Sequence, residues 1–402
     1  MEKVEMRKRR MIMKWGRGVP PFIATTIFSK LVISNLPSCR LVCKTWNDLV
    51  LDYASSSKFQ FLTNAFLLST SDPVLDPISK ASLTNPKLHS INLPTTKHLD
   101  DVDFDLELEF IKSGSLQFHG HWSFIIINNQ CNGLMYISKY TFYSWCYGIF
   151  NPMTNEFIQI PESDDDIYVF GFGYSPTTKQ YKLFRVVDSI TYSKTKTGRS
   201  IVPIVPGTTL MDILTFGRSG TNPSHNQWRH LHTLTFGEFV HNGAYMNGVI
   251  YWLVKEKDKR KEYFIYALDV ETEQIELSVV LQIDPKVGGG RIYQFNGTIY
   301  ATFYIVATVR TIQVWKMQAK GSWIKEFVID DIPKGWGRFD FIKVFEDGEI
   351  LCMINMDFFC FYNSFSKRKK IMPKNQEKFR YICPIESLNF GSLPEILEGM
   401  ES

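Results

Sequence analysis

The stretch MNGVIYWLV at residues 246 to 254 places an Asn-Gly pair beside a run of large apolar side chains. Asn-Gly adopts the positive φ angles of a tight two-residue turn at little steric cost, and apolar or β-branched residues next to such a pair favour β-strands. The stretch therefore predicts a β-hairpin that turns at Asn247 and Gly248.

The same template recurs in CNGLMYI (131 to 137), FNGTIYATF (295 to 303) and EDGEILCMI (346 to 354). The four Asn or Asp positions are separated by 115, 49 and 51 residues, so two gaps hold one repeat each and the first has room for two with an insertion. A repeat of roughly 50 residues is typical of kelch-like propeller blades.

A second hairpin module follows most of these repeats, with Asn or Asp three residues before Thr or Ser. It occurs in FNPMTNEFIQI (150 to 160), LDVETEQIELS (268 to 278) and YNSFSKRKKIM (362 to 372). Two hairpins per repeat give four strands per unit. We therefore predict a large all-β domain over residues 60–390, a β-propeller of five or six blades. Strand pairing by the segment 378–388 is expected to close the ring. A β-sandwich is the alternative.

Composition limits the kind of protein that this chain can be. The 402 residues are 44% hydrophobic with a formal net charge of +4, which excludes disorder throughout and gives no electrostatic footprint for nucleic acid. The basic run RKRR at residues 7 to 10 is the exception. We interpret residues 1–18 as a disordered, solvated tail, with a nuclear-import or phosphate-binding tag as the alternative.

The cysteines and the apolar segments indicate the compartment. Seven cysteines are widely spread without a paired framework, which is typical of a reducing environment. The sequence shows neither a secretory signal nor an apolar segment of the roughly 18 residues that a membrane-spanning helix requires. We expect a cytoplasmic and/or nuclear protein without a membrane partner.

Residues 19–55 differ from the rest of the chain, because their apolar residues recur at helical spacing. Ile23, Ile27 and Leu31 lie at steps of four, after prolines that can open a helix. A second stripe runs at steps of three and four, with a helix break near Lys44-Thr45; it comprises Leu36, Cys39, Cys43, Trp46, Val50 and Tyr53. A unit of this size cannot cover all its apolar surface by itself. The helices therefore either pack on the large domain or form a docking surface for another protein.

The segment VPPFIATTIFSKLVISNLPSCRLVCKTWNDLV (19 to 50) resembles an F-box, most clearly in its second half, R-x-V-C-K-x-W. The first half departs from the family pattern, with Phe22 and Thr26 where acidic residues are usual, Val32 in place of a proline, and Pro37 where a longer side chain is common. The resemblance implies binding to a Skp-type adaptor and, through it, to a cullin-RING ubiquitin ligase. The adaptor contacts that it implies are Val19, Pro20, Ile23, Ile27, Leu31, Leu36, Val42, Cys43, Lys44 and Trp46.

The β domain resembles the F-box-associated domain of a large plant family, through CNGLMYI, FNPMTNEFIQIP, VFGFGYSPTTKQYKLFRVV, MNGVIYWLV and the segments that follow in the same order. Such a domain implies a receptor that selects a target protein, which this sequence does not identify. Blade loops on one rim are the expected target contacts, with the insertion at about 188–226 and the acidic loop 162–166 as candidates.

Enzyme sites find little support in the residues. The pairs His119/His121 and His230/His232 could each offer two metal ligands from a strand, but neither has a carboxylate or Cys at a recognisable spacing. Cys39 and Cys43 are expected to be buried thiols, and the glycines at 171–173 and 288–290 are expected to form turns. We therefore predict no catalytic residue, metal or cofactor. An interaction scaffold without a ligase role, and a sugar-binding or metal-dependent propeller enzyme, are the alternatives.

Overall fold

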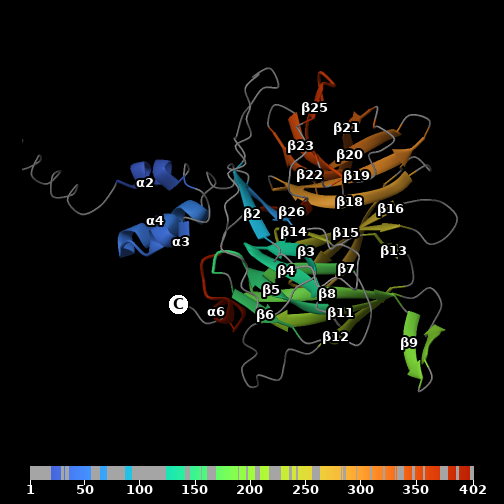
Figure 1. Cartoon of the computed structure of the whole chain (residues 1–402). Helices are drawn as coiled ribbons and strands as arrows, with labels where there is room; N and C mark the ends of the chain where they lie inside the picture. Colours follow the sequence, from blue (N-terminus) through green and yellow to red (C-terminus); the bar gives the residue numbers. More distant parts are fainter. Residues whose placement is uncertain are drawn as a thin grey trace, which may run out of the picture.

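The structure is a computed structural model of the chain, and Figure 1 shows its arrangement. It describes residues 20–28, 31, 36–55, 64–69, 87–92, 124–140, 145–154, 156–160, 169–188, 190–195, 198–203, 209–216, 228–234, 238–240, 243–255, 263–281, 283, 287–295, 297–307, 310–319, 322–330, 332, 339–345, 349–355, 358–371, 379–385 and 389–398. A search of these residues finds no helix with the length and apolar character to cross a bilayer.

The predicted Asn-Gly hairpins are confirmed. The φ angles are 49° at Asn132 and 76° at Gly133, and 49° and 83° at Asn247 and Gly248. Gly297 has a φ of 65° between two paired strands. The predicted turn at 347–348 lies outside the described residues, although the strands on either side of it pair as expected.

Each hairpin belongs to an antiparallel sheet of about four strands. The first sheet contains β3 (Phe124–Cys131), β4 (Leu134–Tyr140), β5 (Trp145–Asn151) and β6 (Glu156–Gln159). The second contains β7 (Val169–Ser175), β8 (Gln180–Asp188), β11 (Thr209–Phe216) and β12 (Arg229–Leu234). We call these sheets blade 1 and blade 2.

Three more sheets follow in chain order. Blade 3 contains β13 (Glu238–Phe239), β14 (Ala244–Met246), β15 (Val249–Lys255), β16 (Tyr263–Asp269) and β17 (Ile275–Leu281). Blade 4 contains β18 (Val287–Phe295), β19 (Thr298–Val306), β20 (Arg310–Ala319) and β21 (Ser322–Ile329). Blade 5 contains β22 (Phe339–Val344), β23 (Glu349–Ile354), β24 (Phe358–Asn363) and β25 (Lys369–Ile371).

A three-stranded sheet completes the ring. Its strands are β2 (Lys87–Asn92), β1 (Asn64–Ser69) and β26 (Phe379–Ile385), in that order. Strand β26 pairs with β1 from the other end of the chain and contacts both β22 of blade 5 and β3 of blade 1. The predicted closing strand is therefore confirmed, and the fold is a β-propeller with five full blades rather than a sandwich.

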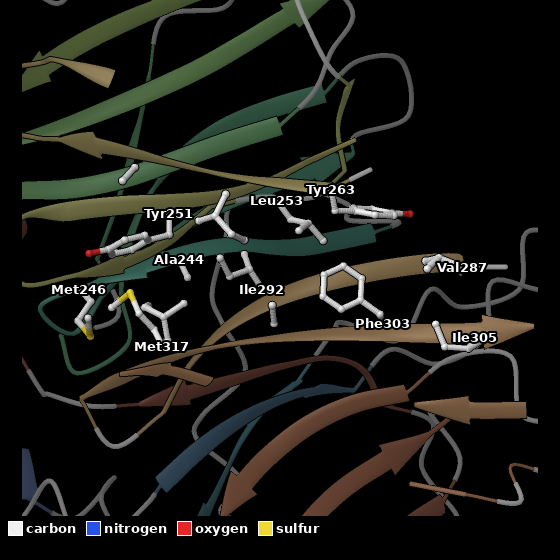
Figure 2. Close-up of a cluster of buried hydrophobic side chains, with 14 residues drawn as sticks. Ala244, Met246, Tyr251, Leu253, Tyr263, Val287, Ile292, Phe303, Ile305 and Met317 are labelled. Atoms are coloured by element: carbon white, nitrogen blue, oxygen red, sulfur yellow. The ribbon is translucent and has the colours of Figure 1, made fainter. Parts of the chain in front are cut away.

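The hydrophobic core lies between neighbouring blades, as Figure 2 shows for blades 3 and 4. Tyr251, Leu253 and Tyr263 project from blade 3 toward Val287 and Phe303 of blade 4, and all five are buried. Because each blade is covered on both faces by its neighbours, its middle strands lose the polar alternation of a half-exposed sheet; all six residues of β23 are buried.

Two glycine runs are strands, so the prediction of turns there is wrong. Gly171 lies in β7 and Gly290 in β18, each the first strand of its blade. A Cβ atom added at Gly171 would lie 2.2 Å from the indole of Trp252, and one at Gly290 would lie 2.7 Å from Leu253. The glycines are therefore needed where a first strand approaches the side chains of the neighbouring blade.

The predicted insertion at 188–226 also needs correction. It contains a separate hairpin of β9 (Ile190–Thr195) and β10 (Gly198–Pro203), but residues 209–216 form β11 within blade 2. The extra segment therefore interrupts a blade between its second and third strands. The acidic loop 162–166 lies outside the described residues.

Candidate protein-docking surface on the N-terminal helices

Three short helices precede the propeller: α2 (Pro21–Phe28), α3 (Leu36–Arg40) and α4 (Lys44–Ser55). The carbonyl of Pro20 accepts hydrogen bonds from the N–H groups of Ile23 (2.9 Å) and Ala24 (3.0 Å), so α2 begins at the prolines as predicted. The predicted break in the second stripe is also present, because residues 41–43 separate α3 from α4.

One side of the helices forms a small core. Phe28 is 1% exposed, and its ring lies 5.5 Å from that of Trp46 and 5.7 Å from that of Tyr53 between centroids. Burial raises the pKa of the Tyr53 hydroxyl to about 12. Leu36 and Val50 complete this buried side.

The core of the helices continues into blade 1. Met135 and Ile137 of β4 and Phe150 of β5 belong to the same buried cluster, together with Phe390 from the C-terminal segment. The helices are therefore not free: part of their apolar surface is covered by their own chain, as one of the two interpretations of the sequence predicts.

A C-terminal clamp, residues 389–398 with α6 (Leu393–Glu398), holds this contact in place. The Arg40 guanidinium lies 5.0 Å from the centroid of the Phe390 ring and donates a 2.7 Å hydrogen bond to the Phe390 carbonyl. On the other side, Asn151 Nδ2 donates to the Gly391 carbonyl at 3.0 Å, and Leu393 N–H donates to the Glu156 carboxylate at 2.5 Å.

Helix α6 then packs into the core between blades 1 and 2. Leu393 is fully buried there, and Leu397 is 5% exposed. The clamp thus joins Arg40 of α3 to two blades, and Figure 1 shows α6 beside β6 of blade 1. The observed contacts set the orientation of the helices on the propeller.

Several large apolar side chains of the helical segment remain exposed. The exposed fractions are 69% for Phe22, 87% for Leu41, 63% for Val42 and 39% for Leu51. Exposed apolar side chains that gather on one small unit are typical of a protein-docking surface, whereas scattered ones are normal on any protein. We call Phe22, Leu41, Val42 and Leu51 the outer patch.

The predicted adaptor contacts divide into groups. Val42, Cys43 and Lys44 are exposed. Half-buried positions are Pro20, Ile23, Ile27, Leu31 and Trp46. Val19 lies outside the described residues.

Two predictions about these side chains are corrected. Leu36 is 1% exposed and supports the helices from within, so its side chain is not available to a partner in this conformation. Cys43 is exposed, not a buried thiol, because the break at 41–43 takes it off the stripe, while Cys39 is half-buried. Burial raises the pKa of the Cys39 thiol.

Phe22, Leu41 and Leu51 are members of the outer patch that the sequence prediction missed. They are not at stripe positions, so helical spacing did not select them. That off-stripe placement was itself a usable signal, because a large apolar residue outside a stripe has no core position to fill.

The histidine pair of β12 is divided between different partners. His230 Nδ1 lies 3.3 Å from Asp212, and His232 Nε2 lies 2.8 Å from the Glu273 carbonyl. Within the described part of the chain, no group of three or more His, Cys, Asp or Glu side chains is arranged to hold a metal ion. His119 and His121 lie outside that part.

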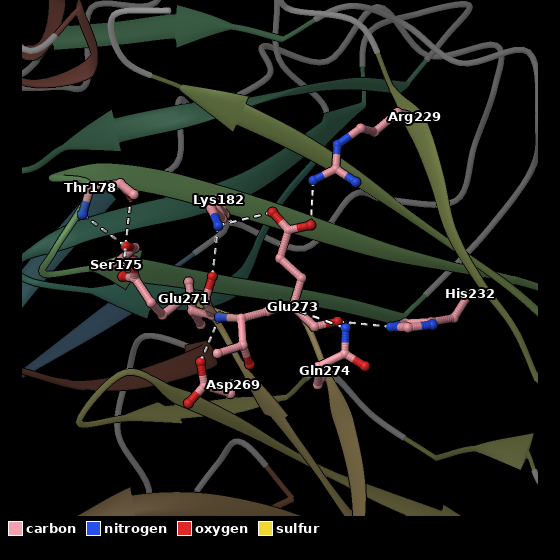
Figure 3. Close-up of polar contacts among 11 residues, drawn as sticks. Ser175, Thr178, Lys182, Arg229, His232, Asp269, Glu271, Glu273 and Gln274 are labelled. Carbon is pink, nitrogen blue, oxygen red and sulfur yellow. Dashed lines mark hydrogen bonds and ion pairs between the residues drawn. The ribbon is translucent and has the colours of Figure 1, made fainter.

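A charge network that includes the buried Lys182 links blades 2 and 3 (Figure 3). The Glu273 carboxylate lies in the turn after β16, 2.9 Å from Lys182 Nζ of β8, and also pairs with Arg229 of β12. Burial raises the pKa of Glu273, but the hydrogen bonds and charges of Arg229 and Lys182 outweigh it, so the pKa lies below its usual value. We interpret this network as structural, because it joins two blades and all its carboxylate oxygens have partners.

Comparisons with known proteins agree with this architecture. The family model described as an F-box associated beta propeller domain matches residues 82–375, and a model described as F-box-like matches residues 18–55. An F-box protein of Arabidopsis thaliana is 25% identical over 339 residues, covering 79% of this chain and 74% of its own length. A putative F-box protein of the same plant is 25% identical over 185 residues, covering 44% of this chain and 43% of its own length.

Among solved structures, TolB from Acinetobacter baumannii aligns with a TM-score of 0.45 and 8% identity, over 85% of this chain and 71% of that one.

Proposed function

Because this chain belongs to the F-box proteins that carry an F-box associated beta propeller domain, we propose that it is the substrate-recognition subunit of a Skp-cullin-F-box ubiquitin ligase. The F-box binds a Skp-type adaptor, and the propeller binds a target protein. The exposure of the outer patch carries this proposal, since four large apolar side chains stay exposed on a helical segment that is otherwise packed against its own chain.

The proposed mechanism is proximity. A receptor that holds a target beside a charged ubiquitin carrier raises the effective concentration of the reacting groups, and no residue of this chain takes part in the chemistry. The clamp supports such a role, because the cation–π contact and the hydrogen bond between Arg40 and Phe390 keep the adaptor end at a set position relative to the propeller. The chain is then a non-catalytic adaptor.

The same proposal places the protein in the cytoplasm and/or the nucleus. The cysteines in the described residues are all free thiols, which suits a reducing compartment. The half-buried residues Ile23, Ile27, Leu31 and Trp46 are proposed to line the adaptor interface together with the outer patch. Leu36 is left out of this interface.

Adaptor binding tests the proposal with a matched pair of variants. Val42 and Val306 are both exposed valines, at 63% and 46%, but Val42 lies in the outer patch and Val306 ends a strand of blade 4. Titration calorimetry of the full chain with a Skp-type adaptor should show binding that Val42→Asp weakens about tenfold or more, because it places a charge in an apolar interface. Val306→Asp should bind like the unaltered chain.

Two outcomes would contradict the proposal. If the unaltered chain does not bind the adaptor at concentrations of about 10 μM, a range that covers ordinary specific complexes, the protein is an interaction scaffold without a ligase role. If Val42→Asp and Val306→Asp bind equally well, the outer patch is not the adaptor surface.

A further inference from the structure

Three blades carry a similar turn between their last two strands. In each, an Asn or Asp side chain accepts a backbone N–H from inside the turn: Asn151 from Met153 (3.0 Å), Asp269 from Thr272 (2.8 Å), and Asn363 from Phe365 (3.0 Å) and Ser366 (2.8 Å). The residue four positions after Asp269 or Asn363 is left-handed, with a φ of 61° at Glu273 and 57° at Lys367. The turns of blades 3 and 5 therefore share one backbone geometry.

The residue two positions after the Asn or Asp stands at the tip of the turn, and in blades 1 and 3 it contacts the rest of the chain. Met153 packs against the cluster that joins the helices to blade 1. Glu271 accepts a hydrogen bond from Ser175 of blade 2. These two tips thus hold parts of the protein together.

The tip of the blade 5 turn is different. Phe365 occupies the same position and is 82% exposed, the most exposed large apolar side chain of the described propeller residues. Its backbone is held by the two hydrogen bonds to Asn363, and the turn is closed by Asn363 N–H donating to the Arg368 carbonyl at 2.9 Å. A preorganised aromatic side chain costs little conformational entropy on binding, which favours it as an interface anchor.

Basic residues follow Phe365 in the chain. Lys367, Arg368 and Lys369 are exposed, and Lys367 Nζ lies 2.8 Å from Asp330 of blade 4. That ion pair fixes Lys367 on the neighbouring blade. Arg368 and Lys369 add positive charge to the turn and to the start of β25. Ile371, 47% exposed, lies on the same side of β25 as Lys369 because side chains alternate along a strand.

Edge protection explains part of this surface but not its centre. Strand β25 is the outer strand of blade 5, and lysines on an outer strand prevent pairing with other chains. This accounts for Lys369 and Lys370. It does not account for Phe365, because an exposed ring at an edge would favour association rather than prevent it.

We propose that the turn 363–368, with Phe365 as anchor, is the docking point for a target segment that combines acidic residues with an apolar side chain. The apolar side chain packs on Phe365, and the acidic residues face Arg368 and Lys369. This inference rests on the proposed function, in which the propeller selects the target, and it names the chemistry of the segment selected.

A peptide series tests the docking point. The probes are fluorescein-labelled heptapeptides with three Asp or Glu residues on each side of a central Leu, Phe or Trp, a central-Ser version, and a version with Lys in place of every acidic residue. Polarisation with the full chain in complex with its adaptor should show binding of the acidic apolar peptides alone. Phe365→Ser and Arg368→Glu should each weaken that binding about tenfold, and salt should weaken it further.

Ile371→Ser provides a control on the rim of the same surface, where a loss of less than threefold is expected because rim contacts contribute less than a central anchor. The inference is overturned if the acidic apolar peptides do not bind at 1 mM, the upper limit of the titration. A Kd of 1 mM corresponds to a binding free energy of only about 4 kcal/mol, so even weak binding would be detected. It is also overturned if Phe365→Ser and Arg368→Glu leave binding unchanged.

Failure of the two proposals can be told apart. Adaptor affinity is measured on the same preparations, and neither Phe365→Ser nor Arg368→Glu should change it. If the chain binds the peptides but not the adaptor, the ligase role is wrong and the docking point stands. If the chain binds the adaptor but not the peptides, the docking point is wrong and the ligase role stands.

Discussion

The helices of residues 20–55 and the blades of the propeller bury their apolar side chains in different ways. Four of the seven exposed large hydrophobic side chains among the described residues belong to the helical segment. Blade strands such as β23 are buried along their whole length, because a neighbouring sheet covers each face. A unit of three short helices lacks that second layer, so it depends on blade 1 and the clamp for part of its cover and keeps other apolar side chains exposed.

This difference predicts an asymmetry: damage to the propeller should destabilise both regions, whereas damage at the clamp should destabilise the helices alone.

The largest effect is expected for Trp252→Ala in the core between blades 2 and 3. Trp252 is fully buried, with its ring 6.0 Å from that of Phe239 and 6.4 Å from that of Phe184 between centroids. Its removal should lower the free energy of unfolding by about 3–5 kcal/mol. Urea denaturation followed by circular dichroism measures this, with Phe365→Ala as an exposed control; a loss below about 1 kcal/mol would contradict the described packing.

Phe390→Ala tests the dependence of the helices on the clamp. Phe390 is 7% exposed and carries both the ring contact and the carbonyl contact to Arg40. The substitution should lower the protection of α2, α3 and α4 by about 2–3 kcal/mol, as expected for a buried aromatic side chain at a domain contact.

Hydrogen exchange measured by mass spectrometry resolves the two regions in that experiment. Amides of β15 and β16 should keep the protection that they have in the unaltered chain. Equal loss of protection in helices and blades would show that the two regions unfold as one unit and would end the comparison drawn above.

Glu273→Gln should have a smaller effect, confined to the propeller. It removes the countercharge of Lys182, whose side chain is 5% exposed, and should cost about 1–3 kcal/mol at neutral pH. Because the pKa of Glu273 is lowered in the fold, its stabilisation is complete above the unfolded-state value of about 4.5 and is lost as the pH falls through the lower folded-state value.

The pH dependence supplies the check on Glu273. The difference in unfolding free energy between the unaltered chain and Glu273→Gln should shrink as the pH falls from 6 toward 3, a range that spans the usual glutamate pKa. A difference that stays constant over this range would mean that Glu273 contributes through packing and not through its charge.

The smallest change in stability is expected for Val42→Asp, the variant that should most affect adaptor binding. Val42 is 63% exposed, so its replacement should shift the free energy of unfolding by no more than about 0.5 kcal/mol. Thermal unfolding of Val42→Asp beside Val306→Asp measures this shift. A large loss of stability for Val42→Asp would mean that the outer patch is structural.

Short sequence patterns predicted much of the fold. Asn-Gly pairs need positive φ angles and alternating strands need a pairing partner, so the hairpins at 132–133 and 247–248 and the closing strand β26 were readable from short stretches. The helix start at Pro21 followed in the same way from proline geometry, whereas the break expected near Lys44-Thr45 lies just before them, at residues 41–43.

The errors came where a distant segment decides the environment. Gly171 and Gly290 were predicted to form turns because glycine favours turns. Each is instead required by a side chain of a neighbouring blade, Trp252, 81 positions after Gly171, and Leu253, 37 positions before Gly290. Residues 209–216 read as insertion because nothing local marks them as the third strand of a blade that was interrupted after its second.

Turn dipeptides and apolar periodicity, which act over a few residues, were enough to establish a helical N-terminal unit, a repeated four-strand blade and a ring closed by the chain ends. Only the tertiary structure decided which face of the helices is covered, through contacts between Arg40, Phe390 and blade 1. It also decided that Phe365 is exposed, whereas Met153 and Glu271, at the same position of similar turns, contact other parts of the chain. Whether a side chain is buried depends on the residues that contact it, and these residues are brought together only when the ring closes.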